Sequence, residues 1–229
     1  MTERTKLGHL ADAEAAERSD DEALSARRWW RLVPAVLTHP QAVFEEIREG
    51  DDDDRLARQE PLLAIVTLSG IAGSIISPVW SRMLDQNGVD GVALLFGTFV
   101  VGGLAGFLQF FLLGWAVWAG ARAVGSLERA VVARHVVGWS AIPVALSLAV
   151  TAPLILVAYG GDFFRAGGSD EGAGRWLVIG IGLGFVAWSL ALLVVGLRTT
   201  FRLPWRGVFG AALLAAGIVG ALAIFPGVV

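Results

Sequence analysis

Long uncharged, apolar stretches alternate with short polar segments from residue 61 onward in this chain. The longest of them, Gly91 to Ala121, contains no charged side chain. At about 1.5 Å per residue, a helix of this length more than covers the ~30 Å hydrocarbon core of a bilayer. The pattern predicts an all-α integral membrane protein, a five-transmembrane-helix bundle with spans at residues 61–80, 91–121, 136–159, 176–197 and 207–227.

The first 60 residues have a different pattern. Residues 1–26 contain no aromatic side chain and few large aliphatic ones, so we predict a disordered acidic tail there. Residues 27–60 are expected to form a cytoplasmic amphipathic or interfacial segment, because Trp29 and Trp30 stand among arginines. Indole and guanidinium groups favour the headgroup layer, which makes these two tryptophans candidate contacts for lipids or a protein partner.

A short amphipathic N-terminal helix is expected within that segment. Pro40 suits the first helical position and Gly50 a helix stop. Between them, Val43, Phe44 and Ile47 share one face and charged residues lie elsewhere. This face predicts a helix that rests on the membrane or on the bundle.

Basic residues near the span ends predict the orientation. Counted from a cytoplasmic N-terminus, 15 of the 18 Lys and Arg residues fall on the inner side and 3 on the outer side. Such an excess of basic residues marks the cytoplasmic side of membrane proteins. We therefore expect a multi-pass protein of the cytoplasmic membrane, with its N-terminus inside, its C-terminus outside and the lipid bilayer as its first partner.

The predicted spans contain no Asp, Glu, Lys, Arg or His, which argues against an ion-coupled pump. Gln109 is the clearest polar side chain at mid-membrane depth. It could line a pathway or hydrogen-bond a neighbouring helix, and we favour the helix contact. Arg122 and His135 lie near the inner ends of the second and third spans and could hold a lipid phosphate. Membrane anchoring explains Arg122 equally well.

Small residues spaced four apart let helix backbones approach closely and predict a compact bundle. Three spans have this spacing: Gly102, Gly106 and Gly114 on the second, Gly180 and Gly184 on the fourth, and Gly217 with Ala221 on the fifth. Pro143 and Pro153 are expected to kink the third span or to unwind it locally.

Candidate chemistry is sparse. The chain has no cysteine, which excludes disulfides and thiolate metal sites. The acidic run 51–54 lacks the spacing of a calcium loop, and we interpret it as a solvated loop. An enzyme would need a pocket that joins groups such as Arg122, Glu128 and His135. We predict no catalytic residue, no cofactor and no metal, and the acidic tail argues against a nucleic-acid partner.

Three segments carry a resemblance to a known family. They are LTHPQAVFEEIREG at residues 37–50, ARAVGSLERAVVARHVVGWSAIPVALSL at residues 121–148 and GLRTTFRLPWRGVFGAALLAAG at residues 196–217. With Pro40, Phe44, the turn at 121–125 and Pro143 as its most telling positions, the chain resembles the bacterial branch of the Yip domain family, the Ypt/Rab-interacting proteins. The resemblance runs roughly from Arg31 to Phe225.

This resemblance implies a five-span membrane protein with a cytoplasmic N-terminal region and no catalytic residues. Eukaryotic members of the family are associated with Rab GTPases and vesicle traffic, and we do not carry GTPase binding over to this chain. We hypothesise a non-enzymatic membrane protein that organises lipids or a membrane or cytoplasmic protein partner. The alternative is a passive transporter or channel for a small solute or lipid.

Overall fold

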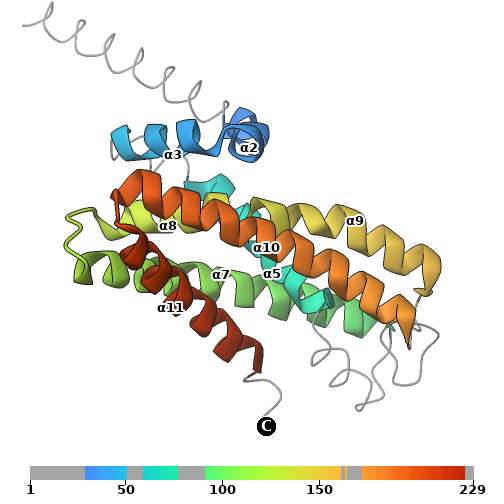
Figure 1. Cartoon of the computed structure of the whole chain (residues 1–229). Helices are drawn as coiled ribbons and strands as arrows, with labels where there is room; N and C mark the ends of the chain where they lie inside the picture. The colour runs from blue at the N-terminus through green and yellow to red at the C-terminus, as the bar shows by residue number, and fades with distance from the viewer. Residues whose placement is uncertain (1–28, 51–58, 77–90, 161–162, 164–171, 225–229) are drawn as a thin grey trace, which may run out of the picture.

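The computed structural model describes residues 29–50, 59–76, 91–160, 163 and 172–224, and regular structure there is helical (Figure 1). In chain order the helices are α2 (Trp29–Thr38), α3 (Pro40–Glu49), α5 (Gln59–Ile76), α7 (Gly91–Ala123), α8 (Ala130–Ser140), α9 (Ile142–Ala158), α10 (Ala173–Phe201) and α11 (Trp205–Ile224). The predicted acidic tail and the acidic run 51–54 lie outside the described residues.

Three helical segments are long and apolar enough to cross a membrane: Phe96–Ala123, Ala130–Ala158 and Ala173–Phe201. They match the second, third and fourth predicted spans. The first and fifth coincide with apolar helices that are shorter within the described residues, Gln59–Ile75 and Trp205–Leu214. The chain is thus a multi-pass membrane protein, and five crossings stay a prediction.

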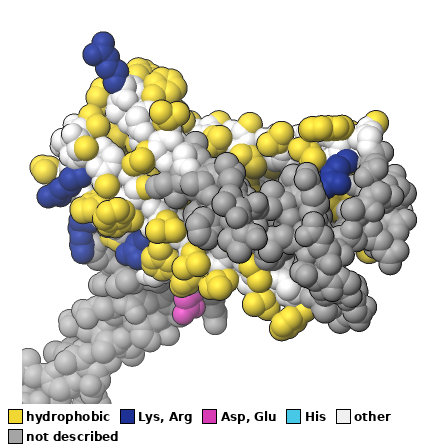
Figure 2. Space-filling view, turned by 90° about the horizontal axis from the view of Figure 1, so that it is seen from below, with side chains coloured by type: hydrophobic (Ala, Val, Ile, Leu, Met, Phe, Trp, Pro, Cys, Tyr) yellow, Lys and Arg dark blue, Asp and Glu magenta, His cyan; other side chains and the backbone are white. Residues whose placement is uncertain are grey.

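Large apolar side chains lie on the outside of the bundle (Figure 2) as well as in its core. Leu104 and Trp115 on α7, Leu183 on α10 and Leu213 on α11 are all exposed. An exposed apolar surface this extensive is typical of a membrane-contacting face. The bundle therefore presents to its surroundings the chemistry that a lipid hydrocarbon core requires.

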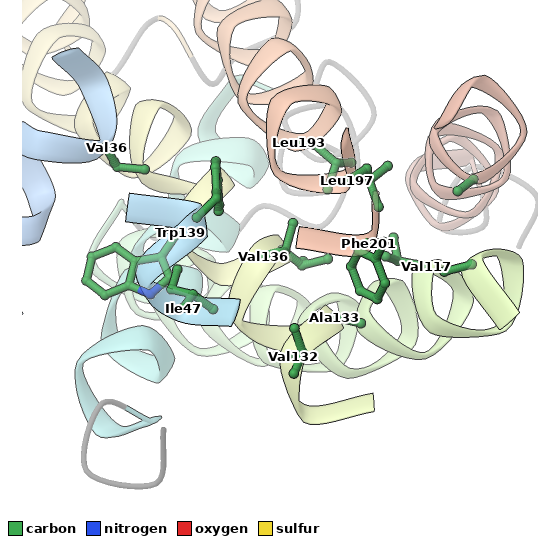
Figure 3. Packing of buried hydrophobic residues seen from close by; sticks show 14 of the residues in the cluster. Val36, Ile47, Val117, Val132, Ala133, Val136, Trp139, Leu193, Leu197 and Phe201 are labelled. Atoms are coloured by element: carbon green, nitrogen blue, oxygen red, sulfur yellow. The ribbon is translucent and has the colours of Figure 1, made fainter. Parts of the chain in front are cut away.

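Helix α3 rests on the bundle, so one of its two predicted positions is confirmed. It begins at Pro40 after the N-cap residue His39 and ends before Gly50, as the sequence indicates. Its predicted apolar face is buried, with Phe44 fully inaccessible. The face joins the main core, in which Ile47 of α3 and Trp139 of α8 belong to the same cluster of buried residues (Figure 3).

Helix α2 was not expected from the sequence. Pro34 lies inside it, and proline removes a helical hydrogen bond and clashes with the preceding turn. The helix is nevertheless held at its end, where the Thr38 hydroxyl donates to the Pro34 carbonyl at 2.9 Å. Its Val36 side chain is fully buried in the same core as α3. Tertiary packing thus outweighs the local preference.

The third span is interrupted where Pro143 predicts. Helix α8 ends at Ser140, and the Ala141 N–H is shared between the carbonyls of Val137 and Gly138 at 3.1 Å each. Helix α9 then begins at Ile142, so that Pro143 falls in its first turn, where a missing N–H costs little. Pro153 lies within α9, which continues through it, so the helix is not unwound there and a kink at Pro153 stays a prediction.

The predicted glycine contacts hold on α7 and fail on α10. A Cβ on Gly102 or Gly106 would collide with α5, where Gly70 is the facing residue. Gly180 and Gly184 have no neighbouring atom within 4 Å among the described residues. The spacing on α10 therefore does not mark a helix contact there, and Gly217 on α11 is equally open.

Candidate functional site

Arginines gather at one end of the bundle, which we call the arginine-rich end. Its members follow from the helix ends that meet there: Arg122 closes α7, Arg129 and Arg134 open α8, and Arg198, Arg202 and Arg206 surround the turn from α10 to α11. Arg175 lies in the first turn of α10, at the opposite end. The dark blue side chains in Figure 2 show the same asymmetry.

The turn between α10 and α11 is held by Arg198. Its guanidinium donates to the Leu203 carbonyl at 3.1 Å and lies 4.4 Å from the centre of the Trp205 ring. Cation–π contact and a charge-assisted hydrogen bond both favour this geometry. One side chain thus joins the last turn of α10 to the first residue of α11.

Arg202 ends α10 in the left-handed conformation, with φ 50° and ψ 33°. Among the described residues it is the only non-glycine residue with positive φ. Glycine is the usual residue at such a helix end because it has no Cβ to clash with the backbone. The chain therefore holds a guanidinium at a position where the backbone favours glycine.

A defined turn closes α7. The Ser126 N–H donates to the Ala121 carbonyl at 3.0 Å and the Gly125 N–H to the Arg122 carbonyl at 3.0 Å. Gly125 has φ 95°, and this pair of bonds around a left-handed glycine is a Schellman motif. The Glu128 N–H then donates to the Ser126 hydroxyl at 3.3 Å, which continues the ordered turn toward α8.

These turns form an open groove of about 550 Å³ together with the end of α3. Its lining residues are Arg48, Gly125, Ser126, Leu127, Glu128, Thr200, Phe201 and Arg202. The volume falls within the ~300–1,000 Å³ range of small-molecule sites. Two guanidiniums and one carboxylate line it, so the groove has a formal charge of +1.

Helix α3 is fixed beside the groove by contacts with the last turns of α10. Thr200 is only 1% exposed, and its hydroxyl donates to the Phe44 carbonyl at 3.3 Å. This hydrogen bond joins residues 156 positions apart in the chain. Gly196, one turn earlier on α10, leaves room for the Phe44 ring, since a Cβ there would lie 3.1 Å from that ring. Arg48, which pairs with Glu49 at 2.9 Å, is thereby positioned at the groove.

Three of the predicted contact residues lie on exposed or partly exposed positions. Trp29 and Trp30 open α2, Trp30 is 56% exposed, and the Arg31 guanidinium lies 5.3 Å from its ring centre. Arg122 is exposed at the end of α7, 6.0 Å from the Trp118 ring. Their proposed role in binding lipids or partners stays a prediction.

The other two predicted residues lie inside helices of the bundle. Gln109 is half-buried in the middle of α7, and no hydrogen bond of its side chain is found within the described part of the chain. His135 is only 2% exposed on α8, and its Nδ1 lies 2.9 Å from the Val131 carbonyl. Such burial leaves the imidazole little surface for a headgroup, and we do not retain it in the contact surface.

The structure does not bring the predicted residues together into one site. Glu128 lines the groove, whereas Arg122 and His135 are not among its lining residues. Sequence reasoning missed Arg48, Thr200 and Arg202. Their only signal is position, since each stands at or near the end of a helix: the amphipathic α3 for Arg48 and the apolar α10 for Thr200 and Arg202. Within the described residues, no group of three His, Asp or Glu side chains could hold a metal ion.

Comparison with known proteins adds one match. The family model of the Yip1 domain matches residues 35–225. No curated protein and no solved structure matches the chain. The match begins within α2, includes α3 and the whole groove, and extends past α11. With a membrane-spanning helical bundle and most of its length covered by this match, the chain belongs to the Yip1 domain family.

Proposed function

We propose that this chain is a non-enzymatic membrane protein that organises protein partners or lipids through its arginine-rich end, in the cytoplasmic membrane of a bacterium. Its family consists generally of non-enzymatic membrane-trafficking proteins. The observation that carries the proposal is the fixed position of α2 and α3. Because Phe44 and Thr200 hold α3 on the bundle, these helices and the groove form one continuous surface.

Charge supports an inward-facing position for this surface. Six arginines lie at the helix ends around it, and the opposite end has Arg175 within the described residues. By the positive-inside rule, the arginine-rich end then faces the cytoplasm. A surface in that place can contact cytoplasmic proteins and inner-leaflet headgroups.

Crosslinking followed by purification from native membranes tests the proposal. Removing residues 1–60 is unsuitable, because it would also remove Phe44 and Ile47 from the core. We would instead substitute exposed residues, with Trp30→Ala and Arg31→Gln combined. The matched control is Trp176→Ala at the other end of the bundle, since Trp176 is exposed as well.

Loss of crosslinked proteins or lipids from the Trp30 and Arg31 double variant alone is the expected result. Identical recovery from all three proteins would remove α2 from the contact surface. The alternative function, passive transport, has its own test in reconstituted vesicles. If the vesicles show saturable solute flux and Gln109→Leu abolishes it, passive transport would replace the function proposed here.

A further inference from the structure

We propose that the groove at the arginine-rich end is a binding site for the headgroup of an anionic glycerophospholipid, with its phosphate at Arg202 and Arg48. The proposal rests on the function above in placing ligand contact at this end of the bundle. It goes further by naming the ligand class and the residues that would bind it.

The charge and hydrogen-bonding capacity of the lining support an anion. Arg48 and Arg202 provide guanidinium donors, and Ser126 adds a hydroxyl. A guanidinium suits the oxygens of a phosphate because its N–H groups can donate in pairs. Glu128 is the one carboxylate of the lining, and Glu49 outside the lining pairs with Arg48 at 2.9 Å, so Arg202 is the guanidinium that would complement the negative charge of the phosphate.

The position of the groove favours a lipid over a dissolved phosphate. It lies where α7 and α10 end, so it adjoins the exposed apolar surface of the bundle. Leu127 belongs to its lining and is 86% exposed. An exposed leucine side chain beside two guanidiniums is complementary to a ligand in which an acyl chain adjoins a phosphate. Trp205, exposed nearby on α11, is typical of residues at headgroup depth.

The backbone at Arg202 supports the same assignment. Glycine would relieve the left-handed conformation at the end of α10, yet the chain has an arginine there, and its side chain lines the groove. A strained residue at a ligand site is a recurrent feature of proteins. The strain also provides a variant, Arg202→Gly, that removes the guanidinium without disturbing the fold.

The test measures phosphatidylglycerol retained by the purified full chain after exchange into phosphatidylcholine nanodiscs with graded phosphatidylglycerol content. Arg202→Gly should weaken this binding more than about tenfold, the expected effect of losing a charge-assisted hydrogen bond to a phosphate. Arg48→Gln should act in the same direction. Glu128→Gln should tighten binding, because it removes a like charge from the groove. Unchanged or raised thermal stability of Arg202→Gly would show that the loss is not unfolding.

Arg206→Gln is the matched control, since Arg206 is an exposed arginine of the same end that does not line the groove. It should weaken binding by no more than about fivefold, the general effect of one arginine near an anionic membrane surface. Equal losses of phosphatidylglycerol binding for Arg202→Gly and Arg206→Gln would mean that the lipid responds only to general surface charge, and this result would overturn the proposal. Unchanged binding by Arg202→Gly would overturn it as well. Inorganic phosphate in excess should not displace the lipid; full displacement would also overturn the lipid assignment.

The outcomes separate this inference from the proposed function. Loss of crosslinked partners from the Trp30 and Arg31 variant does not depend on lipid binding in the groove. If specific phosphatidylglycerol binding persists while no protein partner is recovered, the headgroup site stands without a protein-organising role. If partners are recovered and lipid binding is nonspecific, the function stands and the headgroup site falls.

Discussion

At the scale of single residues, the arginine-rich end depends on side chains with more than one role. Arg198 binds the Leu203 carbonyl and covers the Trp205 ring, and so fixes the turn after α10. The same turn places Arg202 in the lining of the groove. The sequence gives little sign of either role, because an arginine after an apolar span is explained equally well as a topology anchor.

Arg198→Gln tests the first role. The variant should lose the cation–π contact and the charge-assisted hydrogen bond, with a cost of about 1–2 kcal/mol in unfolding free energy. Thermal unfolding of the purified protein in detergent would measure it. Arg206→Gln is the control, since no ring or carbonyl contact of Arg206 is found in the described residues. Equal stability of the two variants would contradict the role of Arg198.

At the scale of elements, the closest helix contact is the crossing of α5 and α7. Backbone atoms around Gly70 and Val66 lie where a Cβ on Gly106 would be placed. The glycine spacing on α7 predicted a contact, but its partner on α5 could not be read from the spacing. On α10 the same spacing faces open space, because the pattern of one helix does not determine its rotation in the bundle.

Gly106→Ala and Gly184→Ala form a matched pair for this crossing. The first should cost about 1–3 kcal/mol, because a methyl group against rigid backbone forces α5 and α7 apart. The second should leave stability unchanged or raise it by up to about 1 kcal/mol, because alanine favours a helix over glycine and no described atom lies near the added methyl group. Unfolding in detergent measures both. Similar effects for the two substitutions would show that the crossing is looser than the structure has it.

At the scale of the whole molecule, charge asymmetry and apolar length determine how the chain lies in a membrane. Arginines lie at the same end of the bundle on α7, α8, α10 and α11, and the positive-inside rule predicts that this end faces the cytoplasm. The sequence counts lead to the same orientation, because basic residues at span ends are visible without a structure. Helix length does not decide whether α5 and α11 cross the membrane, because their apolar segments are shorter than the other three within the described residues.

Cysteine labelling tests orientation and crossing number together, since the chain has no native cysteine. A membrane-impermeant maleimide should label Ala173→Cys in intact cells, and Arg206→Cys only after permeabilisation. Gly88→Cys, between α5 and α7, should be labelled from outside if α5 crosses the membrane. Protection of Gly88→Cys in intact cells would contradict a five-span arrangement, and the reverse pattern at Ala173 and Arg206 would invert the topology.

The sequence by itself determined the solvent, the helical class, the α3 face and the end that collects arginine. These properties depend on run length, local periodicity and charge counts, which each segment carries on its own. Helix α2 escaped prediction because Pro34 opposes helix formation locally, and packing of Val36 and its neighbours on the main core compensates for it.

Only the tertiary structure decided which residues share a site. Arg48, Glu128 and Arg202 come from three segments far apart in the chain, and the Thr200–Phe44 bond joins two of those segments. Their meeting depends on helix rotation, crossing and turn geometry, which arise from packing between distant residues. That is why Gln109 and His135 were candidates from the sequence, while the groove and its two guanidiniums emerged only in the folded chain.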